Sequence, residues 1–140
     1  MNQYTYEQIT VGQEESFSVN ITDENMVAFR KITGDNNPLH CEESYAKSIG
    51  YEGCVVYGML TASFLSTLAG MYLPGEHSLI HEVETKFTKP VVLRGNTVIT
   101  IYGKVVEKHD VFKRIVILVR ITNESGEKVL RGTMKVGVSQ

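Results

Sequence analysis

The second half of the chain alternates between apolar and polar positions, which is the pattern of β-strands that bury one face. Between His81 and Thr88 the two faces separate cleanly, with Val83, Thr85 and Phe87 on one and Glu82, Glu84 and Lys86 on the other. Three longer runs of β-branched and aromatic residues follow, at Val98–Glu107, Phe112–Ile121 and Lys128–Val138. Glycine, asparagine and aspartate occur in the connections, and these residues favour tight turns. The pattern predicts four strands joined as antiparallel hairpins.

The first half begins with a strand and continues with helices. Residues 15–21 alternate moderately and predict a short strand. Thr22 then supplies an N-cap, and acidic residues follow it, which favours a helix that runs through Ile32. Gly34 is a natural residue to end that helix. Residues 42–48 predict another short helix.

Residues 53–75 carry no charge and are long enough to suggest a membrane-spanning helix. Hydroxyl side chains and glycines interrupt this stretch, and its flanks are acidic rather than basic. A helix that is apolar nearly all round, with a few hydroxyls, is typical of the core of a globular protein. We therefore predict a buried helix from about Tyr57 to Tyr72, ended by Pro74 and Gly75.

Helices followed by antiparallel strands indicate an α+β fold, with the sheet wrapped around the long buried helix. The 140 residues are most simply one domain, spanning 1–140. A single sheet on one helix leaves an exposed edge and a partly open core. Pairing of copies would cover both, so we expect a homodimer or a dimer of dimers.

Composition excludes several classes of function. The formal net charge is −2 and 21% of residues are charged, so no basic surface indicates binding to nucleic acid. The two cysteines, Cys41 and Cys54, lack metal-ligand spacing, and no metal site is expected. The first residues are polar and acidic, unlike a signal peptide, which predicts a cytoplasmic protein without a membrane anchor.

The segment Asp35-Asn36-Asn37-Pro38-Leu39-His40 is the strongest candidate for chemistry. Pro38 fixes its own φ and disfavours a helical conformation at Asn37, so the chain must bend between the acid and the imidazole. A carboxylate and a histidine that converge on one cavity can hold a water and move its protons. Taken singly, Asp35 is as well explained as a turn residue and His40 as an ordinary half-buried histidine.

Three motifs together resemble the MaoC-like hot-dog-fold dehydratases and the (R)-specific enoyl-CoA hydratases. The first is Gly34–His40, which is similar to the family's Asp-x-Asn-Pro-x-His signature. The second is Tyr57–Ser63, similar to the His-Gly-Met that begins the family's central helix. The third is Phe87–Gly95, similar to a strand that leads into a Pro-Val turn. The resemblance implies a single hot-dog domain, an antiparallel sheet wrapped around a central helix.

The resemblance also implies a reaction, the reversible hydration of a 2-enoyl thioester to the (R)-3-hydroxyacyl form. Asp35 and His40 would hold the water, and the backbone N–H of Gly58 would stabilise charge on the thioester oxygen. Asn37 would brace the turn or orient a catalytic side chain, and Ser66 would lie near the substrate. No metal or redox cofactor is implied; coenzyme A or an acyl carrier protein would carry the acyl group.

Tyr57 departs from the family, which commonly has histidine there. A phenol still donates a hydrogen bond but does not titrate near neutrality, so we expect Tyr57 to affect substrate identity more than reaction type. Two alternatives stay open: a hot-dog thioesterase, and a binding protein that has lost catalysis. Lys104, Lys108 and Lys113 are candidates for contact with coenzyme A phosphates or are simply solvated.

Overall fold

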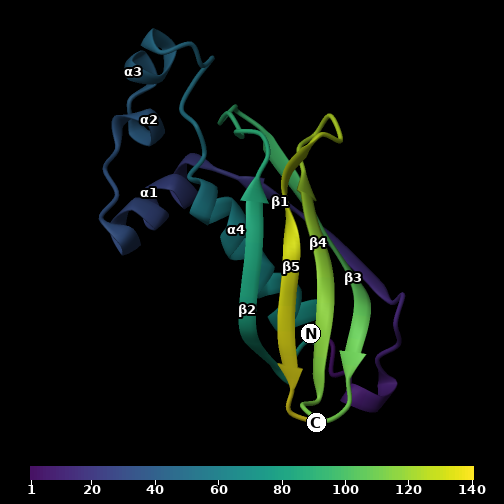
Figure 1. The fold of residues 1–140 in the computed structure, drawn as a ribbon. Helices are drawn as coiled ribbons and strands as arrows, with labels where there is room; N and C mark the ends of the chain where they lie inside the picture. Colours follow the sequence, from purple (N-terminus) through teal and green to yellow (C-terminus); the bar gives the residue numbers. More distant parts are fainter.

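Five antiparallel strands form one curved sheet in the order β1-β3-β4-β5-β2 (Figure 1). A computed structural model describes all 140 residues. The strands are β1 Glu14–Ile21, β2 Ser78–Phe87, β3 Thr97–His109, β4 Arg114–Thr122 and β5 Lys128–Val138. The last three form consecutive hairpins, whereas β2 pairs with β5 and β1 pairs with β3. The two strands that come first in the sequence are therefore the two edges of the sheet.

The uncharged segment lies against one face of this sheet (Figure 1). It forms helix α4, Gly58–Thr67, which continues as the π-helical turn η2, Leu68–Tyr72. Leu65, Leu68 and Leu73 are at most 2% exposed and join the sheet residues in one hydrophobic cluster. The predicted α+β architecture, an antiparallel sheet with a central helix, is confirmed. The helix is buried only on the side that faces the sheet, since Met59 and Met71 are exposed. None of the helices is both long enough and apolar enough to cross a membrane.

Three short helices gather beyond the β2 edge of the sheet, near the start of α4 (Figure 1). They are α1 Asp23–Thr33, α2 Pro38–Cys41 and α3 Glu43–Ser48. Helix α1 begins as expected, because the Thr22 side chain accepts a hydrogen bond from the backbone N–H of Asn25. Asp35, Asn36 and Asn37 connect α1 to α2, and His40 lies on α2.

Some element boundaries differ from the sequence-based expectation. The α2 turn and a 3₁₀ turn, η1 at Tyr6–Gln8, were not expected from the sequence. Strand β2 begins at Ser78 rather than His81 and carries an irregularity between Ile80 and Glu82. Strand β4 begins at Arg114 rather than Phe112, because the preceding residues form the turn from β3, with Lys113 at a positive φ of 50°. The remaining strands match their predicted ranges closely.

Candidate active site

A bend after α1 presents Asp35 to solvent. Gly34 ends the helix with a φ of 74°, a left-handed conformation that glycine adopts without strain. The Asp35 carboxylate accepts a hydrogen bond from the backbone N–H of Asn37 at 3.1 Å. The Asn37 side-chain oxygen in turn accepts from the backbone N–H of Leu39 at 3.0 Å and so caps α2. One carboxylate oxygen is thus held by the turn, and its orientation is set by the backbone.

His40 lies half-buried on α2 with one ring nitrogen committed to the backbone. Its Nδ1 is 2.6 Å from the carbonyl oxygen of Val55. A carbonyl oxygen only accepts, so Nδ1 must carry the proton and donate it. The neutral ring therefore has its lone pair on Nε2, the atom that can take a proton from a bound water.

Tyr57 contacts both Asp35 and His40. Its hydroxyl donates to the backbone carbonyl of Asp35 at 2.6 Å, and its ring stacks on the His40 ring with centroids 4.2 Å apart. Only 2% of Tyr57 is exposed. Burial raises the pKa of the Tyr57 phenol, and nearby Arg30 opposes that rise in part. The phenol therefore stays protonated, and a hydrogen-bond donor, around neutral pH.

Helix α4 begins directly after Tyr57 with no side-chain cap. The first backbone N–H groups of a helix have no intrahelical acceptor, and the helix dipole adds partial positive charge there. Gly58 is the first residue, and a Cβ at this position would lie 3.2 Å from the Phe87 ring. The absence of a side chain leaves room for a substrate atom to approach these groups.

An open groove of about 880 Å³ runs between α4 and β2 and brings the candidate residues together. We call it the α4–β2 groove; its lining residues are Phe29, Thr33, Asp35, His40, Tyr57, Gly58, Met59, Ala62, Ser63, Leu65, Ser66, Ile80, Val83, Thr85 and Phe87. Its walls are mostly apolar, as is usual for pockets that bind small molecules. Asp35, His40 and the helix start at Gly58 form what we call its polar end, and Thr33, Ser63, Ser66 and Thr85 also contribute hydroxyl groups to the lining.

A second, smaller hollow of about 320 Å³ meets the groove at its polar end. Both cavities share His40, Gly58 and Phe87. The smaller one also contains Lys89 and Thr88, from the segment that follows β2. The shared residues make this junction the point where a reacting group can touch both the histidine and the helix N-terminus.

Most of the residues selected from the sequence line the groove. Asp35, His40, Tyr57, Gly58 and Ser66 are all among them. Asn37 is not; its contacts are those of a residue that braces the turn. Sequence reasoning overlooked Phe29, which packs on Tyr57 with ring centroids 4.8 Å apart. It also gave Phe87 no role in the site, although the alternation of β2 already placed Phe87 on one face with Val83 and Thr85.

Comparison with known proteins identifies the family. The family model described as the MaoC like domain matches residues 7–127. The chain belongs to this MaoC-like dehydratase family. A Rhodospirillum rubrum protein named (R)-specific enoyl-CoA hydratase is 32% identical over 136 residues, which cover 95% of this chain and 90% of that protein.

Solved structures of two (R)-hydratases share the fold. The unliganded R-hydratase PhaJ1 from Pseudomonas aeruginosa superimposes with a TM-score of 0.91 at 25% identity, covering 97% of this chain and 86% of that one. The (R)-hydratase from A. caviae involved in PHA biosynthesis gives a TM-score of 0.90 at 27% identity, with 94% of this chain and 98% of that chain covered. The family resemblance found in the sequence is confirmed.

Proposed function

We propose that this protein is a hydro-lyase that adds water to a 2-enoyl thioester and forms the (R)-3-hydroxyacyl thioester. One observation carries the proposal: His40, with its Nδ1–H given to Val55, lines the same groove as the Asp35 carboxylate and the uncapped start of α4. The names of the relatives support it, because the Rhodospirillum rubrum protein that matches 95% of this chain is named (R)-specific enoyl-CoA hydratase.

In the proposed reaction Asp35 and His40 hold one water between them. The water oxygen bonds to C3 of the enoyl group, one of its protons passes to the acid–histidine pair, and the pair returns a proton to C2. The C2=C3 double bond is consumed, and the sum is one water added across it. The hydroxyl oxygen at C3 and the proton at C2 both come from one pair of side chains, so they are added to the same face of the double bond.

Attack at C3 moves negative charge onto the thioester oxygen, which needs a donor. The backbone N–H of Gly58 is suited to this role because it heads an uncapped helix. Ser66 lies further along α4 on the same groove and would contact the acyl group. We place the acyl chain in the apolar α4–β2 groove and the carrier arm in the smaller hollow. The thioester carbonyl would then lie at their junction, beside Gly58 and Phe87.

We assign Tyr57 a positioning role rather than direct contact with the reacting atoms. Its hydroxyl fixes the backbone that carries Asp35, and its ring supports the His40 ring. One side chain thereby links the acid and the base. Orientation of this kind lowers the cost of reaching the reactive geometry.

We infer that two copies of the chain pair along β2 and the exposed side of α4. Met59, Val83 and Phe87 line the groove and are 66%, 45% and 52% exposed, a high exposure for large apolar residues that face one another. Strand β2 is also an edge strand, with hydrogen-bonding groups free to pair. Light scattering should give twice the mass of the chain or a higher multiple; the mass of a monomer would contradict the pairing.

Incubation with crotonyl-CoA tests the reaction. Loss of the enoyl absorbance without release of free thiol is expected, together with (R)-3-hydroxybutyryl-CoA in chiral analysis of the product. Thiol release with the enoyl band intact would instead identify a thioesterase. The (S) product would show that water adds from the other face. If the enoyl absorbance stays constant and no free thiol is released, enzymatic action on this substrate is refuted. A series of longer enoyl groups then measures how much chain the groove accepts.

A further inference from the structure

The outer face of the sheet, turned away from α4, carries a row of positive charges. The strand register places Arg120 of β4 opposite Arg131 of β5, and Arg131 opposite Lys86 of β2. Lys128 lies on the same face at the start of β5 and lines the same surface hollow as the two arginines. We call these four residues, Lys86, Arg120, Lys128 and Arg131, the outer cation patch.

No carboxylate forms an ion pair with the outer cation patch, although Glu84 shares the outer face of β2 with Lys86. None of its members forms an ion pair, whereas Lys104 and Lys135 on the same sheet pair with Glu14 and Glu82. The lysines suggested by the sequence are also engaged, since Lys108 donates to the backbone of η1 and Lys113 pairs with Glu7. Like charges directly opposite across strands destabilise a sheet. The repulsion within the patch therefore lowers the stability of the sheet, and a bound anionic partner would reduce that repulsion.

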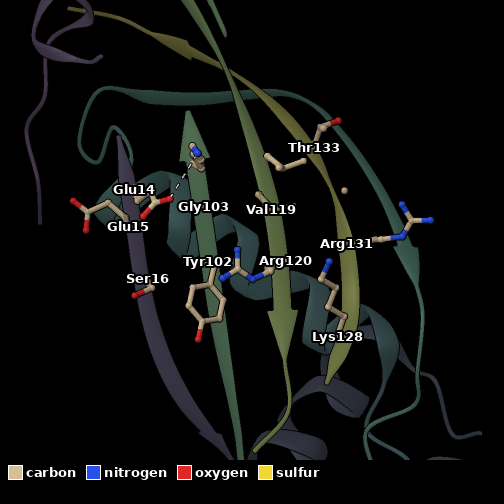
Figure 2. A pocket seen from close by; sticks show the side chains of 13 residues that line it. Glu14, Glu15, Ser16, Tyr102, Gly103, Val119, Arg120, Lys128, Arg131 and Thr133 are labelled. Carbon is tan, nitrogen blue, oxygen red and sulfur yellow. Dashed lines mark ion pairs between the residues drawn. The ribbon is translucent and has the colours of Figure 1, made fainter. Parts of the chain in front are cut away.

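The side chains of the patch do not converge on one point. The Arg120 guanidinium lies over the Tyr102 ring at 4.1 Å, whereas Arg131 points the other way, toward β2 (Figure 2). Arg120, Lys128 and Arg131 line a shallow hollow of about 770 Å³ that extends over four strands. Its β1 side also carries Glu14 and Glu15, so the positive charge lies at the β4–β5 side. A single phosphate is bound by donors that converge on it. Diverging cations on a broad face fit instead a surface that carries several separate carboxylates.

The patch lies at the end of the sheet where the α4–β2 groove opens. Lys86 and Phe87 are neighbours on β2, and their side chains face the outer surface and the groove respectively. Thr88, which lines the smaller hollow, donates its hydroxyl to the backbone carbonyl of Lys128 at 2.8 Å. A partner bound to the patch would therefore be separated from the smaller hollow only by the end of β2.

We propose that the outer cation patch docks the acidic surface of an acyl carrier protein that delivers the acyl thioester to this site. The proposal rests on the proposed function and names its carrier. The outer cation patch is complementary in charge to an acidic partner. It is a local positive surface, because the chain as a whole has a net charge of −2. A second copy of this chain seated symmetrically would bring the same cations together, which disfavours self-association here. The smaller hollow would receive the flexible arm that joins the acyl group to its carrier.

The test compares one acyl group on two carriers. Rates are measured with crotonyl-CoA and with crotonyl-loaded acyl carrier protein, for the parent protein and for the double variant Lys86→Glu/Arg131→Glu. We expect kcat/KM for the protein-borne substrate to fall about tenfold or more, and kcat/KM for crotonyl-CoA to change less than about twofold. Added salt should lower kcat/KM of the parent protein on the carrier-borne substrate for the same reason.

Lys113→Glu is the control for a charge reversal far from the patch, because Lys113 lies at the β3–β4 turn, the other end of the sheet. Its melting temperature is measured as well, since the substitution also breaks the ion pair with Glu7. Its activity with both substrates should be unchanged. A Lys86→Gln/Arg131→Gln variant, free of the like-charge contact, serves if the reversal variant melts early. A loss confined to crotonyl-CoA would mean that the patch holds the coenzyme A nucleotide. Equal losses with both substrates would mean that the substitutions act on the shared arm or on the groove wall, and either result would overturn carrier docking. Unchanged rates with the carrier-borne substrate would overturn it too.

Binding separates this proposal from the proposed function. The affinity for the carrier protein without an acyl group is measured by titration, with no turnover required. Loss of affinity in the double variant, with the control unaffected, would support docking even if no hydration of either thioester were detected. Absence of any binding by the parent protein, together with efficient turnover of crotonyl-CoA, would overturn docking and leave the hydratase assignment intact.

Discussion

His40 and Asp35 have different constraints on their chemistry, although both belong to one turn. The imidazole has Nε2 free because Nδ1 is used by Val55, and the carboxylate has one oxygen occupied by the Asn37 backbone. Asp35→Asn and His40→Gln remove an acid or base while conserving shape. Each should lower kcat for hydration by about 10²–10⁴, with an unchanged melting temperature. Steady-state rates with crotonyl-CoA measure the effect, and near-normal activity in either variant would refute the assigned pair.

Tyr57 should act on rate through position alone. Tyr57→Phe keeps the stacking on His40 and deletes the hydrogen bond to the Asp35 carbonyl. We expect a loss of about 1 kcal/mol in stability, the ordinary net value of a hydrogen bond. We also expect kcat to fall about tenfold with little change in KM, because the acid is less well held. Kinetics and urea unfolding measure the two effects.

A purely structural Tyr57 would give the stability loss without the change in kcat. Tyr57→His supplies the residue common in the family and provides the comparison: if the imidazole also reaches the Asp35 carbonyl, it should restore part of kcat. A shift in acyl-chain preference with kcat maintained would instead indicate that Tyr57 selects the substrate.

At the residue scale the sequence identified which kinds of residue form the site, but it did not predict which of them contact one another. The Asp35–His40 motif could be recognised because proline enforces the bend within six residues. The hydrogen bond from Tyr57 to Asp35 joins residues 22 positions apart, and no local pattern reports it. Replacement of the expected histidine by Tyr57 was visible, but its burial was not.

At the scale of elements, the edge strand β2 depends on one glycine in its neighbour β5. A Cβ on Gly132 would lie 1.9 Å from the backbone carbonyl oxygen of Glu84, so the two strands would have to separate. We expect Gly132→Ala to cost about 3 kcal/mol or more, at the upper end for overpacking, and to lower activity because β2 forms one wall of the groove. Chemical unfolding and turnover of crotonyl-CoA measure both.

Gly70→Ala is the control for that substitution. A Cβ there meets nothing within 4 Å, and the residue lies in η2 without a positive φ. Its stability should be unchanged or slightly increased. Equal stability of the two alanine variants would show that β5 and β2 tolerate separation at Gly132.

Element types followed from the sequence more readily than their arrangement. Alternation identified each main strand, and the uncharged run identified the central helix. The sheet order was predicted only in part. The hairpins β3–β4 and β4–β5 are present, but the hairpin expected between residues 81–88 and 98–107 is wrong, because β2 pairs with β5 and local periodicity carries no information on that pairing. The same limit applied to the groove, whose two walls come from α4 and this edge strand.

At the scale of the whole molecule, the N-terminal segment is fastened to the far end of the sheet by Tyr6. Its hydroxyl donates to Asp110 at 2.6 Å, and Lys108 donates to the backbone carbonyls of Tyr6 and Ile9. Burial, with the Asp110 carboxylate adding to it, raises the pKa of Tyr6 to about 12. An unfolded tyrosine has a pKa of about 10.

Stability should therefore depend on alkaline pH through Tyr6. Below pH about 10 the phenol is protonated in both states and its contribution is complete. Between about 10 and about 12 the unfolded state loses its proton first, so the contribution falls as pH rises. The stability advantage of the parent protein over Tyr6→Phe, measured by urea unfolding, should shrink from pH 9 to pH 11. A constant difference would show that the pKa of Tyr6 is not raised.

The pairing of β2 with β5 sets an order of events during synthesis. Strand β2 leaves the ribosome before β3, β4 and β5, yet within the chain it pairs only with β5. Until residues 128–138 emerge, Leu79, Val83 and Phe87 remain on an unpaired strand, which is the condition under which nascent chains associate wrongly. The groove wall is therefore the final part of the molecule to form, and a ribosome stalled before Lys128 carries Asp35 and His40 without a binding site for an acyl chain.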